Sequence, residues 1–462
     1  MPVTPFLAEM LRVADVKRPL DFLDFLVEFP PEETGIGTLS GVPGIKLGRS
    51  ALGFFAVNAP LSAVARLERL GVNIHYNAPM RMLIAPSILD PVLGRFSVSN
   101  VVAPYSRGEN FKRRTAAALK IPASVLGSFG MRTAAPEQPD FHMVPSSETR
   151  AIVLDEPEIR LSGTKVAVID TGLTPVHPQF NPLVSRPFVS TAVLEPPVDM
   201  TGHGQHVTTV AFGGAANTKF GKVMGVVTVT GSDLLHVKCL TVNGFGPTSA
   251  VLFAIEQAIR WGARVINMSL GGILQGSVED DPLCKVIARF KDKVIFVVAA
   301  GNSGPDPWTI DTPGASPHAL TVGAYSPVYK GIASFSSRGP NAAWYKDHVL
   351  DFTRETAKYG EDFLKPDCVA PGGGPVDPKD KPDLIYSGLT GWMNGTYDGN
   401  PFDLFEGLRG TSMAAPVASG LVALAISRGQ VNTAADVKHK LAVSTKDPNQ
   451  GYGLLTYQTL SR

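Results

Sequence analysis

The sequence predicts an α/β protein with a mostly parallel sheet flanked by helices, preceded by a smaller α+β domain. Two observations favour this fold class. Apolar runs of strand length, such as Val166–Ile169 and Val294–Ala299, show no polar alternation, which is typical of strands buried on both faces. Helical periodicity separates such runs after residue 149, whereas before residue 105 strand signals surround one short helix.

Composition bounds the partners that this chain is expected to have. A chain of 462 residues with 44% apolar residues can bury a large core, and its formal charge of +1 favours neither nucleic acid nor an anionic membrane as a partner. The N-terminus lacks a basic segment followed by a long apolar core, and no run reaches the roughly 18 apolar residues of a membrane span. We therefore expect no signal peptide, no membrane insertion and, by default, a cytoplasmic location. Export by an unusual route and association with a virus-like particle stay open.

Residues 1–105 are expected to form the α+β domain. In order, its elements are a short helix within residues 1–20, strands at Phe22–Phe29 and Leu52–Val57, a helix over residues 61–70, and strands at Ile74–Tyr76 and Met80–Ile84. Residues 106–148 then carry clustered basic residues, small residues and three prolines among polar neighbours. This composition indicates an exposed linker that a protease can cut.

The second domain is expected over residues 149–462. Its strands are Val166–Ile169, Leu234–Leu240, Val265–Met268 and Val294–Ala299, and its helices cover residues 251–263, 280–290 and 417–426. Asp170, Ser269 and Asn302 follow three of these strands. Functional groups collect at the carboxyl ends of parallel strands, so we expect these three side chains at one edge of the sheet.

Ser412 lies where a Gly-rich loop meets the apolar run Val417–Ile426. Free N–H groups and the helix dipole favour negative charge at such a helix start, as the anionic intermediate of acyl transfer requires. An ordinary helix cap by Thr411 or Ser412 is the alternative.

Four stretches together resemble the subtilisin-like serine peptidases, in the chain order Asp, His, Asn, Ser. They are VAVIDTG around Asp170, GHGQHV around His203, AAGNSGP around Asn302 and GTSMAAP around Ser412. The resemblance covers about residues 150–462 and implies a subtilisin-like fold. It implies that Ser412 attacks the peptide carbonyl, His203 carries the proton, Asp170 orients the histidine and Asn302 donates to the oxyanion.

The same resemblance implies a substrate site. Ser269, Leu270 and Gly271 would pair with the substrate backbone as an added strand, while Ala300 and Gly301 would line the pocket for the side chain before the cut. Peptides or proteins are then the substrates. The N-terminal region would be a prodomain that blocks the cleft, and Ser412 would cut the chain within residues 115–148. A permanent accessory domain is the alternative to such a zymogen.

The sequence departs from the family pattern at several positions. Gln205 stands where the family usually has Thr, and Thr208 and Thr209 replace small residues. Gln179 stands where calcium-binding members place an aspartate, so we expect no metal site there; no cofactor is required, and calcium elsewhere has no clear site. Residues 341–363 and 373–408 are insertions. The aromatic residues of the second are expected to form its own small core rather than a wall of the cleft.

A second hypothesis comes from a different class of function. A catalytically silent scaffold with the same fold would hold peptides at the sheet edge without cutting them. The presence of Asp170, His203, Asn302 and Ser412 together favours a serine endopeptidase that works through an acyl-enzyme.

Overall fold

The computed structural model describes residues 22–29, 39–68, 70–83, 141–180, 187–274, 277–340, 360–391, 393 and 403–462. The helix expected within residues 1–20, nearly all of the linker 106–148 and most of the insertion 341–363 lie outside these residues. The chain forms two compact units, one of residues 1–77 and 86–139 and the other of residues 78–85 and 140–462. Within the described residues, none of the helices has the length and apolar character of a membrane span.

The first unit contains an antiparallel sheet in the order β2-β3-β1-β4. Its elements are β1 (Phe22–Glu28), β2 (Lys46–Ala51), β3 (Phe54–Pro60), α3 (Leu61–Glu68) and β4 (Asn73–Tyr76). The strand expected at Leu52–Val57 starts two residues later, because Leu52 and Gly53 have φ angles of 54° and 90° and make the turn of a hairpin. The sequence analysis missed β2, whose residues are exposed except for the last one and therefore carry no apolar alternation.

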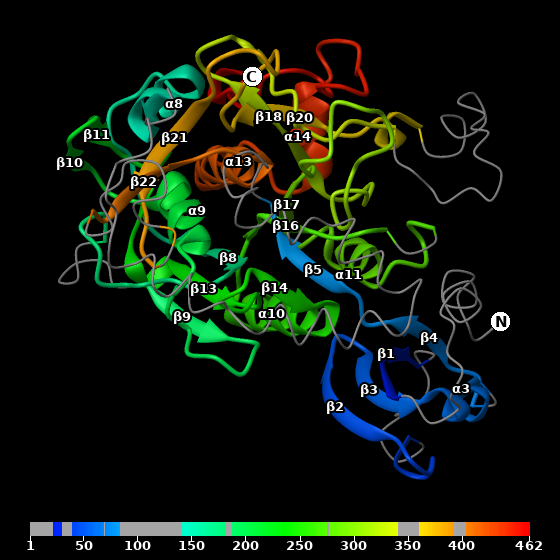
Figure 1. The fold of residues 1–462 in the computed structure, drawn as a ribbon. Helices are drawn as coiled ribbons and strands as arrows, with labels where there is room; N and C mark the ends of the chain where they lie inside the picture. Colours follow the sequence, from blue (N-terminus) through cyan, green and yellow to red (C-terminus); the bar gives the residue numbers. More distant parts are fainter. Residues whose placement is uncertain are drawn as a thin grey trace. The chain divides into compact units, whose positions relative to one another are not determined.

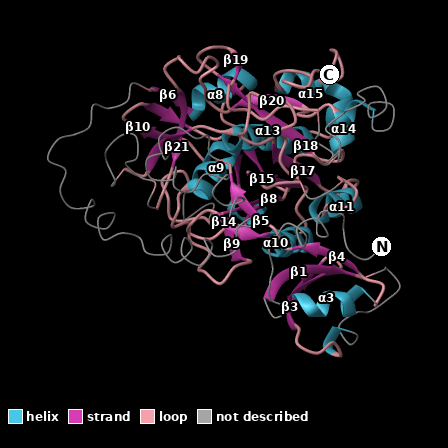
Figure 2. Ribbon diagram, turned by 45° about the vertical axis from the view of Figure 1, so that its right-hand side comes forward, coloured by secondary structure: helices cyan, strands magenta, loops and turns pink. Residues whose placement is uncertain are grey.

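The second unit is built on an eight-stranded sheet in the order β19-β18-β17-β15-β8-β13-β9, with β20 pairing β18 (Figures 1 and 2). Every pair in it is parallel except that of β18 with β19. The strands are β8 (Val166–Asp170), β9 (Phe188–Thr191), β13 (Leu234–Lys238), β15 (Val265–Met268), β17 (Ile295–Ala299), β18 (Leu320–Ser326), β19 (Gly331–Ile332) and β20 (Cys368–Pro371). The predicted α/β class with a mostly parallel sheet is confirmed.

Helices cover both faces of this sheet. The helices α9 (His203–Phe212) and α13 (Thr411–Ser427) pack together on one face, and α10 (Thr248–Trp261) and α11 (Pro282–Phe290) on the other (Figures 1 and 2). The helix expected over residues 280–290 begins at Pro282, because the Asp281 side chain caps it by accepting the N–H groups of Leu283 and Cys284. The described residues of this unit also contain α8 (Ser146–Val153), α14 (Ala434–Leu441) and α15 (Tyr457–Ser461), and 3-10 turns at Gly231–Asp233 and Gly360–Phe363.

Smaller sheets lie beside the main one. Two of them are strand pairs: β7 (Arg160–Leu161) with β12 (Thr228–Val229), and β10 (Ala216–Thr218) with β11 (Gly221–Val223). A three-stranded sheet has the order β14 (Phe245–Pro247), β5 (Pro79–Met82), β16 (Leu270–Gly271). Another has the order β22 (Phe405–Leu408), β21 (Asp383–Gly388), β6 (His142–Pro145). The insertion 373–408 supplies β21 and β22. Its Tyr386 and Phe405 are buried, but they pack with Val223 from outside the insertion, so they do not form a core of the insertion's own.

Candidate active site

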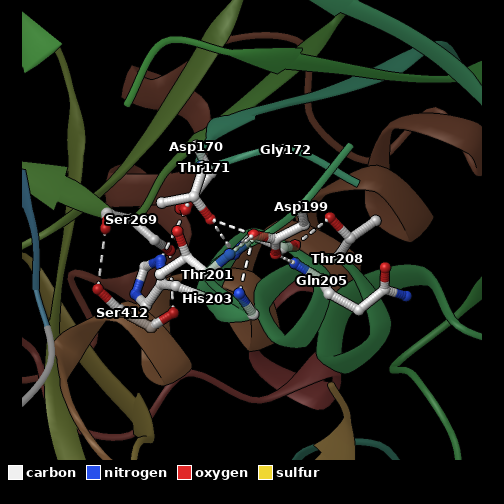
Figure 3. Close-up of polar contacts among 12 residues, drawn as sticks. Asp170, Thr171, Gly172, Asp199, Thr201, His203, Gln205, Thr208, Ser269 and Ser412 are labelled. Atoms are coloured by element: carbon white, nitrogen blue, oxygen red, sulfur yellow. Dashed lines mark hydrogen bonds and ion pairs between the residues drawn. The ribbon is translucent and has the colours of Figure 1, made fainter. Parts of the chain in front are cut away.

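Asp170 and His203 form the centre of the site. Asp170 ends β8 and His203 opens α9, and both side chains are fully buried. The Oδ1 atom of Asp170 lies 2.6 Å from Nδ1 of His203 (Figure 3). This contact fixes the ring and leaves Nε2 of His203 as the nitrogen that is available for proton transfer. In the described part of the chain Nε2 has no hydrogen-bond partner.

Ser412 is the second residue of α13 and lies beside His203 in Figure 3. Its hydroxyl donates to the carbonyl of Ser269 over 2.9 Å, and the Ser269 hydroxyl donates to the carbonyl of Ser412 over 2.9 Å. The second bond has a cause in the sequence. Pro416 has no N–H, so the Ser412 carbonyl four residues earlier lacks its helical partner and accepts from Ser269 instead.

Asn302 lies against the first turn of α13. Its Oδ1 accepts the N–H and the hydroxyl of Thr411, each over 2.9 Å. The Oδ1 atom of Asn302 is thereby bound to Thr411, the residue before Ser412, and the Nδ2 atom makes neither of these two bonds. That Nδ2 atom is buried and has no hydrogen-bond partner among the described residues. A buried donor without a partner next to a serine is suited to receive a developing negative charge.

Asp199 is a residue of this site that the sequence analysis missed. Its carboxylate accepts the N–H groups of Thr201, Gly202 and Gln205 at 3.0, 2.8 and 2.7 Å and the hydroxyl of Thr171 at 3.0 Å (Figure 3). The carboxylate therefore ties the start of α9 to the end of β8. Burial raises the pKa of Asp199 to about 6, against the lowering effect of the hydrogen bonds. The sequence pattern that could have predicted this role is an aspartate shortly before the start of a helix, where its carboxylate can accept free N–H groups.

Gly202 sets the angle at which the chain enters α9. Its φ of 112° is unfavourable for other residues, and a Cβ there would collide with the carbonyl of Thr390 and with the side chain of Leu389. Gly202 is therefore required before His203 both because of its φ angle and because no Cβ atom fits at this position.

The unusual residues behind His203 are hydrogen-bonded within the fold. The Gln205 Oε1 atom accepts the N–H of Thr174 over 2.9 Å. Thr208 donates to the carbonyl of Gly204 over 2.6 Å and lies 3.1 Å from Nδ1 of His236. Burial lowers the pKa of His236 to about 3, so this ring is neutral and acts as a fixed spacer.

Thr209, His206 and His177 have structural contacts. Thr209 donates to the carbonyls of His206 and Gly388. The Nε2 atoms of His206 and His177 lie 2.9 and 2.8 Å from the carbonyls of Ile385 and Leu404. Burial lowers the pKa values of these histidines to about 3 and about 4, so neither ring is charged near neutrality.

The residues expected to pair with the substrate backbone form one buried strand edge, and Ser269 on this edge contacts Ser412. Leu270 and Gly271 form β16, which pairs antiparallel with β5, and β5 pairs antiparallel with β14 on its other side. In this register Met82 lies opposite Leu270 and Arg81 opposite Gly271. One further step places Leu83 opposite Ser269, the residue that holds the Ser412 hydroxyl. A segment from early in the chain thus occupies the edge that was predicted to receive substrate.

Ala300 and Gly301 follow β17 and are buried beside this edge. The N–H of Gly301 donates to the hydroxyl of Thr411 over 3.2 Å, which joins this segment to the start of α13. At Gln179, where a carboxylate would be needed for calcium, the side-chain amide donates to the carbonyl of Gly214 over 3.2 Å. Within the described residues there is no cluster of three or more histidine, cysteine or carboxylate side chains with metal-binding geometry.

A buried aspartate–histidine pair beside a serine at a helix start, on the carboxyl edge of a parallel sheet, is the arrangement of a serine peptidase. The chain belongs to the subtilase family, whose model matches residues 162–456. The subtilisin-like fold that the motifs implied is therefore confirmed, and the protein is a serine peptidase at the level of its family.

Characterised relatives cover different shares of the chain. It is 29% identical to the serine protease AprX of Bacillus subtilis over 66% of this chain and 67% of that protein. It is 31% identical to subtilisin of Bacillus pumilus over 64% of this chain and 88% of that protein. Its match to pyrolysin of Pyrococcus furiosus, 32% identical, spans 43% of this chain but only 13% of that protein.

Proposed function

We propose that the protein is a serine endopeptidase that cuts peptide bonds through an acyl-enzyme. The observation that carries this proposal is the 2.6 Å contact between Asp170 and His203 beside the Ser412 hydroxyl. Ser412 attacks the peptide carbonyl while Nε2 of His203 takes its proton and then gives it to the leaving amine. Asp170 stabilises the imidazolium that forms. Water then attacks the acyl-enzyme with His203 again acting as the base.

Asn302 stabilises the intermediate of this reaction in our proposal. Its unpaired Nδ2–H donates to the oxyanion, together with the N–H of Ser412 at the start of α13. Because Thr411 holds the side-chain oxygen, the amide is already oriented before substrate arrives. The proposed steps use side chains of the protein, the main-chain N–H of Ser412 and water.

We also propose that the chain is made as a self-processing zymogen. The strand β5 follows the α+β unit directly in the chain and pairs with β16 in the manner proposed for substrate. The register favours a cut at the peptide bond after Leu83, ahead of the linker where the sequence analysis expected one. An accessory domain that is never removed is the alternative.

A probe experiment tests the proposed chemistry. Processed wild type, the Ser412→Ala variant, which is expected to keep its full length, and a processed Ser427→Ala control from the end of the same helix are treated with a fluorophosphonate and assayed on a fluorogenic peptide amide. We expect labelling and hydrolysis in wild type and in Ser427→Ala and neither in Ser412→Ala. Processed wild type that neither labels nor cleaves would instead indicate a silent scaffold.

Intact mass and N-terminal sequencing of wild type and Ser412→Ala test the zymogen proposal. A cut in wild type that is absent from Ser412→Ala supports self-processing, and the new N-terminus shows whether the bond follows residue 83 or lies within residues 115–148. If both proteins keep their full length, the N-terminal unit is a lasting part of the structure.

A further inference from the structure

Asp311 lies between two glycines of the substrate edge. Its N–H donates to the carbonyl of Ala300 over 3.0 Å, which fixes its place next to the end of β17. A Cβ added at Gly271 would lie 2.8 Å from Cβ of Asp311, and one added at Gly301 would lie 3.0 Å from its Oδ2. The Asp311 side chain therefore occupies space that would be filled by a Cβ atom if either Gly271 or Gly301 were another residue.

The carboxylate of Asp311 is buried without full compensation. The residue is 8% exposed, and its Oδ2 accepts no hydrogen bond from the described part of the chain. Burial raises its pKa to about 6 even though Arg81 acts in the opposite direction. A buried carboxylate oxygen that accepts no hydrogen bond is costly, so such an atom at a binding edge indicates a partner that arrives with the ligand.

The charge that compensates Asp311 comes from the strand that occupies the edge. The Nη2 atom of Arg81 lies 3.6 Å from Oδ2 of Asp311, an ion pair and not a hydrogen bond. Arg81 belongs to β5 and lies opposite Gly271. If β5 is the segment that substrate replaces, Asp311 loses its cation when β5 leaves. A substrate with a basic side chain on the same face would restore it.

The register shows which substrate positions reach this carboxylate. Side chains two residues apart in a strand point to the same face, so Arg81 and Leu83 share the face toward Gly271. A Cβ at Gly271 would also lie 3.0 Å from Cδ1 of Leu83, which places the Leu83 side chain next to Asp311. Leu83 is opposite Ser269 and hence beside Ser412, and Arg81 is two residues before it.

We propose that Asp311 is a specificity-determining residue whose carboxylate selects substrates with an arginine or lysine on this face of the bound strand. The position of Arg81, two residues before the residue at the cut, is the one where the structure shows the pair. The position of Leu83 is the other one within reach. This inference rests on the proposed peptidase function and narrows its substrates to peptides with a basic side chain near the cut.

The test uses processed protein in three forms: wild type, Asp311→Asn, and Asp306→Asn, which changes an exposed aspartate of the same loop. The first substrate is the peptide of residues 78–83, Ala-Pro-Met-Arg-Met-Leu, ending in a fluorogenic amide, beside the same peptide with citrulline for arginine. Citrulline keeps the shape of arginine and removes its charge. A second pair carries alanine at the Arg81 position and arginine or citrulline at the Leu83 position.

We expect wild type and Asp306→Asn to prefer arginine over citrulline at least tenfold in kcat/KM in one of the two pairs. Asp311→Asn should reduce that preference to threefold or less, and the pair in which this happens identifies the position. An equal preference in wild type and Asp311→Asn, or no preference for arginine in either pair, overturns the proposal. Fluorophosphonate labelling of each protein separates this failure from failure of the peptidase function, because a working Ser412 labels whatever its peptide preference.

Discussion

Replacing Asp199 by asparagine tests whether this carboxylate positions His203, the proposed general base. In Asp199→Asn the side-chain oxygen can replace only one of the two carboxylate oxygens. The orientation that loses fewer hydrogen bonds directs the NH₂ group toward Gln205, whose N–H donates to Asp199 over 2.7 Å in the wild-type protein. Two donors would then face each other at the start of α9. The oxygen that remains would still accept from Thr201, Gly202 and Thr171 but would no longer be charged.

Two opposing terms set the effect on stability. Loss of a hydrogen bond to a charged group costs about 1.5–3 kcal/mol. Against this, burial raises the pKa of Asp199 from 3.8 to about 6, so keeping the group charged in the folded protein at pH 7 costs about 3 kcal/mol, which asparagine avoids. The two terms nearly cancel. We therefore expect the free energy of unfolding at pH 7 to change by less than about 2 kcal/mol.

The effect of Asp199→Asn on catalysis should be larger than its effect on stability, because no opposing term offsets the displacement of His203. Gln205 is two residues from His203, and release of its N–H frees the first turn of α9. A displacement of about 1 Å at a catalytic group costs up to about a hundredfold in rate, so we expect kcat to fall at least tenfold while KM changes little. The control is Asp436→Asn, which removes a carboxylate that accepts N–H groups at the start of α14, away from the site.

The assays are steady-state hydrolysis by the processed proteins and urea unfolding in the Ser412→Ala background, where self-digestion is absent. The sign of the pH effect gives a second check. Since the pKa is raised in the folded state, Asp199 destabilises wild type as pH rises from about 4 to above 6, and Asp199→Asn should gain relative to wild type over that window. An unchanged kcat would refute the positioning role. A loss of more than about 3 kcal/mol in the free energy of unfolding at pH 7 would show that the avoided cost of the buried charge does not offset the lost hydrogen bond.

Three other predictions concern the oxyanion donor, a buried ion cluster and the charge of Asp311. Asn302→Ala should lower kcat about 10²- to 10³-fold with KM nearly unchanged, and an unaltered kcat would exclude it as the oxyanion donor. Asp367→Asn removes the carboxylate that lies 2.6 Å from Nζ of Lys365 and 2.8 Å from Nζ of Lys446, so urea unfolding in the Ser412→Ala background should show a loss of about 3–5 kcal/mol. The matched surface change, Asp292→Asn, should cost under about 1 kcal/mol, and an equal cost for both would contradict this account. Since the pKa of Asp311 is about 6 and its carboxylate is charged above that pH, the preference for arginine over citrulline should weaken as pH falls below 6; a ratio constant from pH 5 to 8 would contradict it.

Much of the fold and the centre of the site could be predicted because both follow from local patterns. The buried parallel strands have apolar runs without alternation. Asp170, Ser269 and Asn302 lie at or within three residues of the carboxyl ends of three such strands, which placed these residues at one edge. The start of α11 was readable because Asp281 and Pro282 act within one helical turn.

The features that the sequence did not reveal depend on contacts between distant segments. The role of Asp199 arises from the approach of its loop to Thr171, 28 residues earlier in the chain. Asp311 lies in a loop without periodicity, and its meaning depends on Gly271, Gly301 and the strand that carries Arg81. The strand expected at Met80–Ile84 corresponds to β5, which begins one residue earlier and ends at Met82, while Ile84 lies outside the described residues. No local property shows that this strand pairs with β14 and β16.

The place of β5 has a consequence for competition with other peptides. A strand that is part of the same chain binds its edge as an intramolecular ligand, and such tethering gives an effective concentration in the millimolar range. An outside peptide with equal contacts must therefore reach about that concentration to displace it. The chain from β5 to the rest of its unit runs through residues 84–139. One cut after Leu83 would therefore break this connection without changing a single contact, and dilution alone would then favour release.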